Sequence, residues 1–193
     1  MLADDGELLC RGPTGMRRYR GEPGKTAQAI DPDGWLRTGE IADIDPDGYV
    51  RIVDRKKELI INAAGKNMSP SNIEAKVKTA GPLIGQAVTI GDRRPYNVAL
   101  IVLDPEACAA HAAAQGLPDG SVAALSRDLR VAAAVAGAVE RANSQLARVE
   151  QIKRYKILPD GWPAGGRELT PTMKLKRKPI AERYADEIEA LYR

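Results

Sequence analysis

The residues near the C-terminus are the best suited in the chain to phosphate chemistry. Residues 169–178 read LTPTMKLKRK, so four of the last five positions are basic. A lysine carries a compact positive charge on a flexible stem, and such a charge can stabilise negative charge that develops on a phosphate. Taken alone, however, a basic run of this kind is more often a solvated or phosphate-attracting surface. Chemistry here would need other residues to hold a substrate.

Three further segments carry residue types that could supply this. Residues 34–40 read GWLRTGE, and the carboxylate of Glu40 can accept hydrogen bonds from two vicinal hydroxyls at once. Residues 54–60 read DRKKELI, a charged run between apolar segments that is typical of a domain boundary. Residues 62–74 read NAAGKNMSPSNIE, in which Gly65 would allow close backbone approach to a ligand.

Together these segments resemble the adenylate-forming (ANL) superfamily of acyl-CoA ligases, luciferases and peptide-synthetase adenylation domains. The resemblance spans nearly the whole chain and is strongest to the long-chain fatty acyl-CoA ligases. It implies that Glu40, at the position of a usual Asp, and Arg55 bind the nucleotide, and that Asp54 is the hinge. It also implies that Ala64 and Gly65 line the tunnel for CoA, and that no metal is bound by this chain.

The resemblance identifies Lys174 as the catalytic residue, with Lys176 as the alternative if the alignment slips by two positions. The implied reaction joins a fatty acid to MgATP as an acyl-adenylate, and CoA then displaces AMP to form a thioester. ATP, with Mg²⁺, and CoA are thus substrates, and no cofactor is expected to bind this chain tightly. No Ser/Thr/Gly-rich phosphate loop precedes these motifs, so we expect the chain alone to be inactive.

Two other functions are open on the sequence. One is an acyl-AMP ligase, or another adenylate-forming enzyme, that passes its product to a carrier protein. The other, from a different class, is a non-catalytic binding module that uses the basic residues at 174–178 together with Lys56 and Lys57. Equal and salt-sensitive losses on substituting Lys174 and Lys178 would favour the binding module.

Composition excludes several other classes. Hydrophobic residues make up 44% of the 193 residues, and the formal net charge of +3 gives no support for nucleic-acid binding. Cys10 and Cys108 lack the spacing of a disulfide framework or a zinc site, which favours a cytoplasmic setting. The sole histidine, His111, has no nucleophile motif beside it and is interpreted as helix surface. No apolar run approaches a membrane span, although peripheral membrane association stays open.

The expected fold class is α+β. Residues 1–53 are expected to be a β-rich remnant of a large AMP-binding domain, 54–58 a hinge and linker, and 59–193 a small C-terminal lid domain. That domain should contain a three-stranded sheet flanked by helices, plus a β-hairpin. The remnant should contain a strand at 7–11, a helix near 25–30 and a hairpin of strands 41–45 and 49–53, whose exposed edges leave self-association open.

In the C-terminal part we expect strands at 86–90, 97–103 and 151–158. Helices are expected from Ser69, from Asp104 to Gln115, over 128–149 and over 179–192. The apolar stripe of the third helix consists of Val135, Val139, Ala142, Leu146 and Val149.

Overall fold

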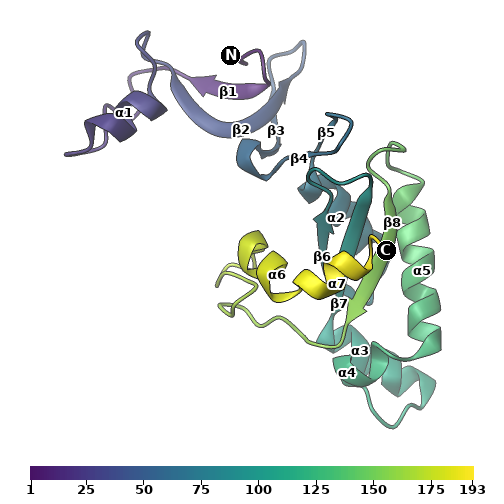
Figure 1. The fold of residues 1–193 in the computed structure, drawn as a ribbon. Coiled ribbons are helices and arrows are strands. Elements are labelled where there is room, and N and C mark those ends of the chain that lie inside the picture. Colours follow the sequence, from purple (N-terminus) through teal and green to yellow (C-terminus); the bar gives the residue numbers. More distant parts are fainter. The chain divides into compact units, whose positions relative to one another are not determined.

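The computed structural model describes all residues from 1 to 193. The chain forms two compact units, residues 1–59 and residues 60–193 (Figure 1). Strands and helices occur in both units, as expected for an α+β protein. None of the helices combines the length and the apolar character that crossing a bilayer requires.

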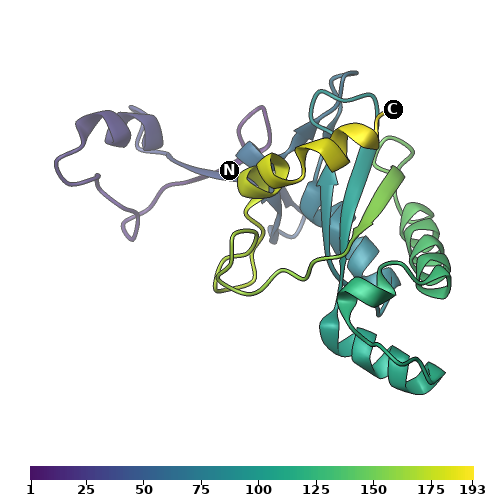
Figure 2. The ribbon, with the colours of Figure 1, turned by 60° about the horizontal axis from the view of Figure 1, so that its bottom comes forward.

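The first unit is built on a three-stranded antiparallel sheet, with the strands in sequence order. Figure 2 shows a short helix that projects away from this sheet. Its elements are β1 (Glu7–Cys10), α1 (Pro23–Ala29), β2 (Leu36–Ile44), β3 (Val50–Arg55) and the 3-10 turn η1 (Lys56–Glu58). The predicted strand and helix are both present, and the predicted hairpin is formed by β2 and β3. Apolar Tyr49, Val50 and Ile52 remain exposed on this hairpin.

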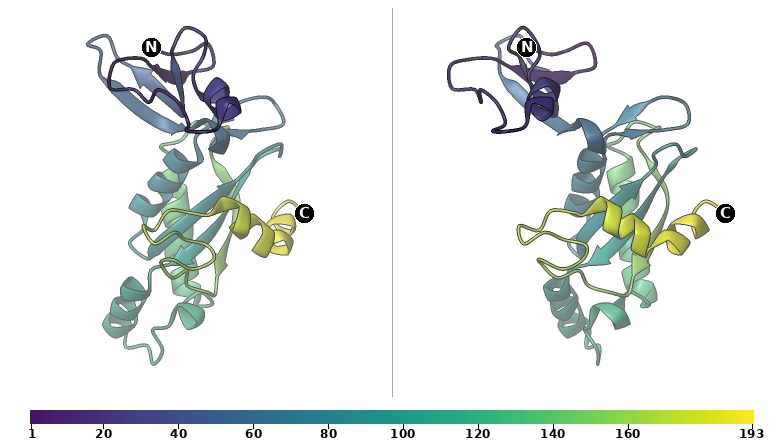
Figure 3. Two further views of the ribbon diagram at one scale, coloured as in Figure 1. Left: turned by 90° about the vertical axis from the view of Figure 1, so that its left-hand side faces the viewer. Right: turned by 60° about the vertical axis from the view of Figure 1, so that its left-hand side comes forward.

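The second unit is a mixed sheet with helices on both faces (Figure 3). The central strand β7 (Asn97–Leu103) pairs antiparallel with β6 (Ile84–Ile90) and parallel with β8 (Ile152–Leu158). Every residue of β7 is buried. After Asn97 the strand is a continuous apolar run, as expected for a strand that is covered on both faces. A separate two-stranded hairpin, β4 (Ile60–Ile61) with β5 (Asn67–Met68), opens the unit.

Successive residues of each strand point to opposite faces of the sheet, so the sheet lies between two apolar cores. One face packs against α2 (Pro70–Ala80) and α5 (Leu129–Asn143), and α3 (Pro105–Gln115) with α4 (Val122–Leu125) completes the crossover from β7 to β8. The other face is covered by α6 (Arg177–Arg183) and α7 (Ala185–Ala190), through Ile180, Tyr184 and Ile188. The lid domain predicted from the resemblance therefore has the expected architecture.

The helix starts follow the local capping signals. The hydroxyl of Ser69 accepts a hydrogen bond from the backbone N–H of Asn72 at 3.1 Å, and Pro70 occupies the first turn. The carboxylate of Asp104 accepts one from the N–H of Ala107 at 2.9 Å. These caps fix where α2 and α3 begin.

Three predictions for the second unit need correction. The helix expected over 128–149 ends at Asn143, because the Asn143 side chain bonds both the N–H and the C=O of Ile152, each at 2.9 Å, and Val149 is exposed. The C-terminal helix is interrupted at Tyr184, which leaves α6 and α7 as separate helices. His111 lies in α3 but is not simply on the surface, because its Nε2 atom is buried without a hydrogen-bond partner.

Candidate functional site

The predicted catalytic lysine lies on a tight loop, which we call the lysine loop (residues 169–176). Leu169 and Leu175 form an antiparallel bridge at its base, and Leu169 is fully buried in the core beneath α6 and α7. Within the loop, the N–H of Thr170 donates to the carbonyl of Lys174 at 2.8 Å, and the N–H of Lys174 donates to the hydroxyl of Thr170 at 3.0 Å. Met173 adopts a positive φ of 61° to close the turn. The backbone that carries Lys174 is therefore ordered.

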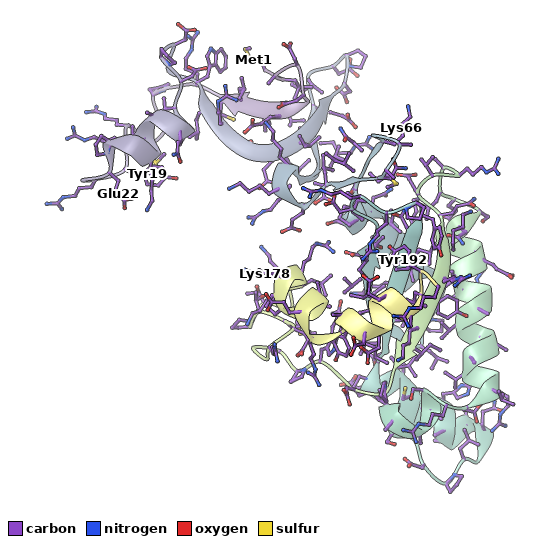
Figure 4. The ribbon with its side chains drawn as sticks, in the orientation of Figure 1. Met1, Tyr19, Glu22, Lys66, Lys178 and Tyr192 are labelled. Atoms are coloured by element: carbon purple, nitrogen blue, oxygen red, sulfur yellow. The ribbon has the colours of Figure 1, made fainter.

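The two candidate lysines of this loop differ in what their ammonium groups contact. Lys174 is exposed, and its ammonium makes no hydrogen bond or ion pair within the chain. The ammonium of Lys176 donates to the carbonyl of Gly166 at 2.8 Å, and its side chain is partly buried. Lys178 is exposed on α6, as Figure 4 shows. Lys174 is thus available to a ligand, whereas Lys176 is used to hold the loop.

A buried carboxylate, which the sequence did not single out, fastens the base of the lysine loop. Glu168 is only 2% exposed, and the guanidinium of Arg183 on α6 donates to it at 2.5 Å. The carbonyl of Glu168 also accepts from the N–H of Lys176 at 2.8 Å. The pKa of Arg183 is raised, chiefly by its hydrogen bond to Glu168. The loop and α6 are therefore held together by a charge-assisted contact.

The two predicted nucleotide-binding residues of the first unit contact each other. Glu40 on β2 stands opposite Arg55 on β3 in the sheet register, and their side chains form an ion pair with 3.3 Å between Oε1 and Nε. The side chains are 30% and 65% exposed, respectively, so both can still reach a ligand. A carboxylate and a guanidinium in this arrangement offer hydrogen-bond acceptors for hydroxyls and a donor fork for phosphate.

Sequence reasoning missed the group that shapes the bend before Glu40. Glu7 is 3% exposed and accepts hydrogen bonds from the N–H of Gly39 and the ammonium of Lys56, each at 2.9 Å. Burial alone would raise the pKa of Glu7, but the hydrogen bonds from Lys56 and Gly39 outweigh it and the pKa is lowered. Lys56, predicted only as part of a basic run, also pairs with Asp5. It is therefore engaged inside the first unit.

The other predicted residues lie at turns and strand ends. Asp54 is 6% exposed near the end of β3, and its carboxylate accepts from the N–H of Arg55 at 2.7 Å. Ala64 and Gly65 are exposed in the turn between β4 and β5, next to Lys66, which Figure 4 labels. Gly65 has a φ of +75°, which side chains rarely adopt, and a Cβ there would meet no atom within 4 Å. The turn itself therefore favours glycine, and one face of it is open.

An apolar pocket of the second unit lies elsewhere. It has a volume of about 570 Å³ and is lined mainly by small residues of α3 and α5, together with His111 and Arg141. None of the predicted site residues lines it. No group of three or more His, Cys, Asp or Glu side chains is arranged to hold a metal ion.

The chain is similar in sequence to fatty-acid–CoA ligases. Over 191 residues the chain is 58% identical to a putative fatty-acid–CoA ligase, fadD11, of Mycobacterium tuberculosis, covering 99% of this chain and 33% of that protein. It is 42% identical to the long-chain-fatty-acid–CoA ligase FadD15 of the same species, covering 99% of this chain and 32% of the relative. The chain thus spans about a third of the length of the curated relatives it matches.

Among solved structures, the chain is similar to adenylation domains of carboxylate reductases. The adenylation domain of a carboxylate reductase from Mycobacterium chelonae superposes with a TM-score of 0.74 at 25% identity, over 97% of this chain and 27% of that one. The corresponding domain from Segniliparus rugosus, in complex with AMP and a carboxylic acid, gives 0.74 at 26% identity, over 97% and 28%. Residues 57–193 match the family described as the AMP-binding enzyme C-terminal domain, and the chain belongs to that family of adenylate-forming enzymes.

Proposed function

We propose that this chain is the C-terminal part of a long-chain fatty acid–CoA ligase, which makes acyl-CoA, AMP and pyrophosphate from a fatty acid, ATP and CoA. Mg²⁺ accompanies ATP, and the larger AMP-binding domain supplies the acyl pocket. Within this chain, Lys174 acts in adenylation, Glu40 and Arg55 bind the nucleotide, Asp54 is the hinge, and the turn at Gly65 receives CoA. The proposed domains are residues 1–53, the remnant of the large AMP-binding domain; residues 54–58, the hinge and linker; and residues 59–193, the mobile C-terminal domain.

The observation that carries this proposal is the unpaired ammonium of Lys174 on an ordered loop. In the first step a carboxylate oxygen of the fatty acid attacks the α-phosphorus of ATP, and pyrophosphate leaves with the electron pair of the broken P–O bond. Negative charge grows on the phosphate oxygens during this attack. A positioned ammonium that has no internal contact to break can stabilise this charge. No proton has to move in this step.

In the second step the sulfur of CoA attacks the acyl carbon, AMP leaves, and the thiol proton is released. The exposed turn at Ala64 and Gly65 is small enough for an extended pantetheine arm to pass close to its backbone. A rotation about Asp54 would present Lys174 to the phosphate in the first step and this turn to CoA in the second, as in enzymes with mobile lids. Lys57, which is exposed after Asp54, would stay solvated in both orientations.

The non-catalytic binding module is less well supported. It needs a continuous set of free cations, but the ammonium groups of Lys56 and Lys176 are already held by groups within the chain. An acyl-AMP ligase is a closer alternative, since it shares the first step. The exposed edges of the first unit also leave pairing with a second copy open.

The test uses the full-length protein that carries this chain. We expect ATP–pyrophosphate exchange that depends on a long-chain fatty acid, and acyl-CoA formation with free CoA; exchange without any thioester would favour the acyl-AMP ligase. Lys174→Ala should lower exchange by about 10²-fold or more, while Lys178→Ala should change it little. Equal, salt-sensitive losses for both variants, or turnover by the isolated 193-residue chain, would contradict the proposal.

A further inference from the structure

We infer that the ion pair between Glu74 and Arg177 positions the lysine loop, so that Arg177 is a positioning residue for the adenylation step. This inference rests on the proposed role of Lys174. Glu74 is the last residue of the segment 62–74, and Arg177 is the first residue of α6, directly after the lysine loop. The pair joins two of the sequence segments that suggested the function, although they lie 103 residues apart.

The contact is bidentate and largely buried. The two terminal nitrogens of Arg177 donate to the two carboxylate oxygens of Glu74 at 2.7 and 2.9 Å. Glu74 is only 5% exposed, and the side chain of Arg177 is 23% exposed. A planar fork on a carboxylate fixes the angle between the groups as well as their distance, which a single lysine contact does not.

Glu74 is itself held in place from a third element. Its Oε1 atom also accepts a hydrogen bond from the backbone N–H of Thr89 on β6 at 2.8 Å. The carboxylate therefore connects α2, β6 and the start of α6. Because α2 and β6 belong to the packed core of the unit, the contact of Arg177 with Glu74 fixes the position of α6 relative to that core.

The position of Lys174 depends on this connection. Lys174 precedes Arg177 by three residues, and the contact between Glu168 and Arg183 fastens the other end of the loop to α6 rather than to the core. That contact moves with the helix, whereas the Glu74 pair and the apolar packing of Leu169, Leu175 and Ile180 tie the loop and α6 to the sheet. A charge that must meet a phosphate within hydrogen-bond distance is sensitive to errors of about 1 Å.

The experiment separates the two half-reactions of the full-length protein. Arg177→Met should lower fatty-acid-dependent ATP–pyrophosphate exchange by about 10- to 100-fold, mainly in kcat. Thioester formation from a supplied acyl-adenylate, which does not use the lysine, should stay within about two-fold. Arg177→Lys, which keeps the charge but loses the fork, should fall between. In a Lys174→Ala background, Arg177→Met should add less than about two-fold, because it acts through that lysine.

Two further variants control for folding. Arg177→Met removes the guanidinium from a buried carboxylate, so the double variant Glu74→Gln with Arg177→Met should recover the melting temperature while exchange stays low. Arg141→Met removes another arginine that tethers α2, through its contact with the carbonyl of Ala80 at 2.7 Å, without touching the lysine loop. It should leave both half-reactions within about two-fold.

The outcomes distinguish the inference from the proposal beneath it. If Lys174→Ala does not reduce exchange, the proposed function is wrong. If Lys174→Ala reduces exchange but Arg177→Met does not, only the positioning inference is wrong. The inference is also overturned if Arg177→Met slows both half-reactions equally and the double variant with Glu74→Gln restores both, because the pair would then serve stability alone.

Discussion

Substituting Lys174 and Lys176 separately should have opposite consequences for stability and activity. The ammonium of Lys174 is exposed and makes no hydrogen bond or ion pair within the chain, so Lys174→Ala should change the free energy of unfolding by less than about 0.5 kcal/mol. Lys176→Ala removes a charged hydrogen bond of 2.8 Å to the carbonyl of Gly166. For a partly exposed group we expect this to cost about 1 to 1.5 kcal/mol.

The size of the expected thermal shift follows from the length of the second unit. With an unfolding entropy of about 2.1 cal/mol/K per residue, a unit of about 130 residues loses about 4 to 5 °C of melting temperature for such a cost. Lys176→Ala should therefore melt measurably earlier, whereas Lys174→Ala should melt within about 2 °C of the parent. Scanning calorimetry of the 193-residue variants measures both.

Activity should follow the reverse order. In the full-length protein, Lys174→Ala should reduce ATP–pyrophosphate exchange by about 10²- to 10³-fold, the usual loss for a preorganised group that stabilises transition-state charge. Lys176→Ala should reduce it by less than about 10-fold, through a looser loop. A larger loss for Lys176→Ala at unchanged stability would refute this reasoning, and would show that Lys176 meets the phosphate instead.

Three other expectations concern single groups. Gly65→Ala, which forces a side chain to a φ of +75° with free space around it, should destabilise the β4–β5 turn by about 1 kcal/mol, and should slow thioester formation more than pyrophosphate exchange. Cys10 is exposed and should react with a thiol reagent in the folded chain, whereas Cys108, whose thiol pKa is raised by burial and by nearby Asp104, should react only after unfolding. Lys56→Met should destabilise the first unit at pH 7, where Glu7 is a buried carboxylate. The loss of stability should shrink as the pH falls and Glu7 is protonated. Calorimetry at pH 7 and at about pH 3.5 measures this, and a loss that does not depend on pH would show that the pairing is unimportant.

Features that depend on neighbouring residues in the chain could be predicted from the sequence. Ser69 followed by Pro70 sets the start of α2, and Asp104 sets the start of α3, because a cap and the N–H groups it satisfies lie within one turn. The β2–β3 hairpin likewise depends on the residues of its own turn. The α+β class and the family followed from such local motifs.

Features that depend on distant contacts could not be predicted. Helix α5 ends early because Asn143 bonds the backbone of Ile152, nine residues later in a different element. Glu7 is a buried acceptor for Gly39 and Lys56, which lie 32 and 49 residues away. Nothing in the spacing of these residues indicates that they meet, since only tertiary packing decides which charges are buried together.

Tertiary packing also explains why Lys174 has no internal partner in a loop flanked by acids. The buried carboxylates of Glu168 and Glu74 would each attract an ammonium, and either contact would occupy the charge that the proposed adenylation step needs. Both carboxylates are instead paired with arginines, Arg183 and Arg177, whose planar forks suit carboxylates better than lysine does. Because the arginines compensate the buried acids, the ammonium of Lys174 stays exposed, as its proposed role in adenylation requires.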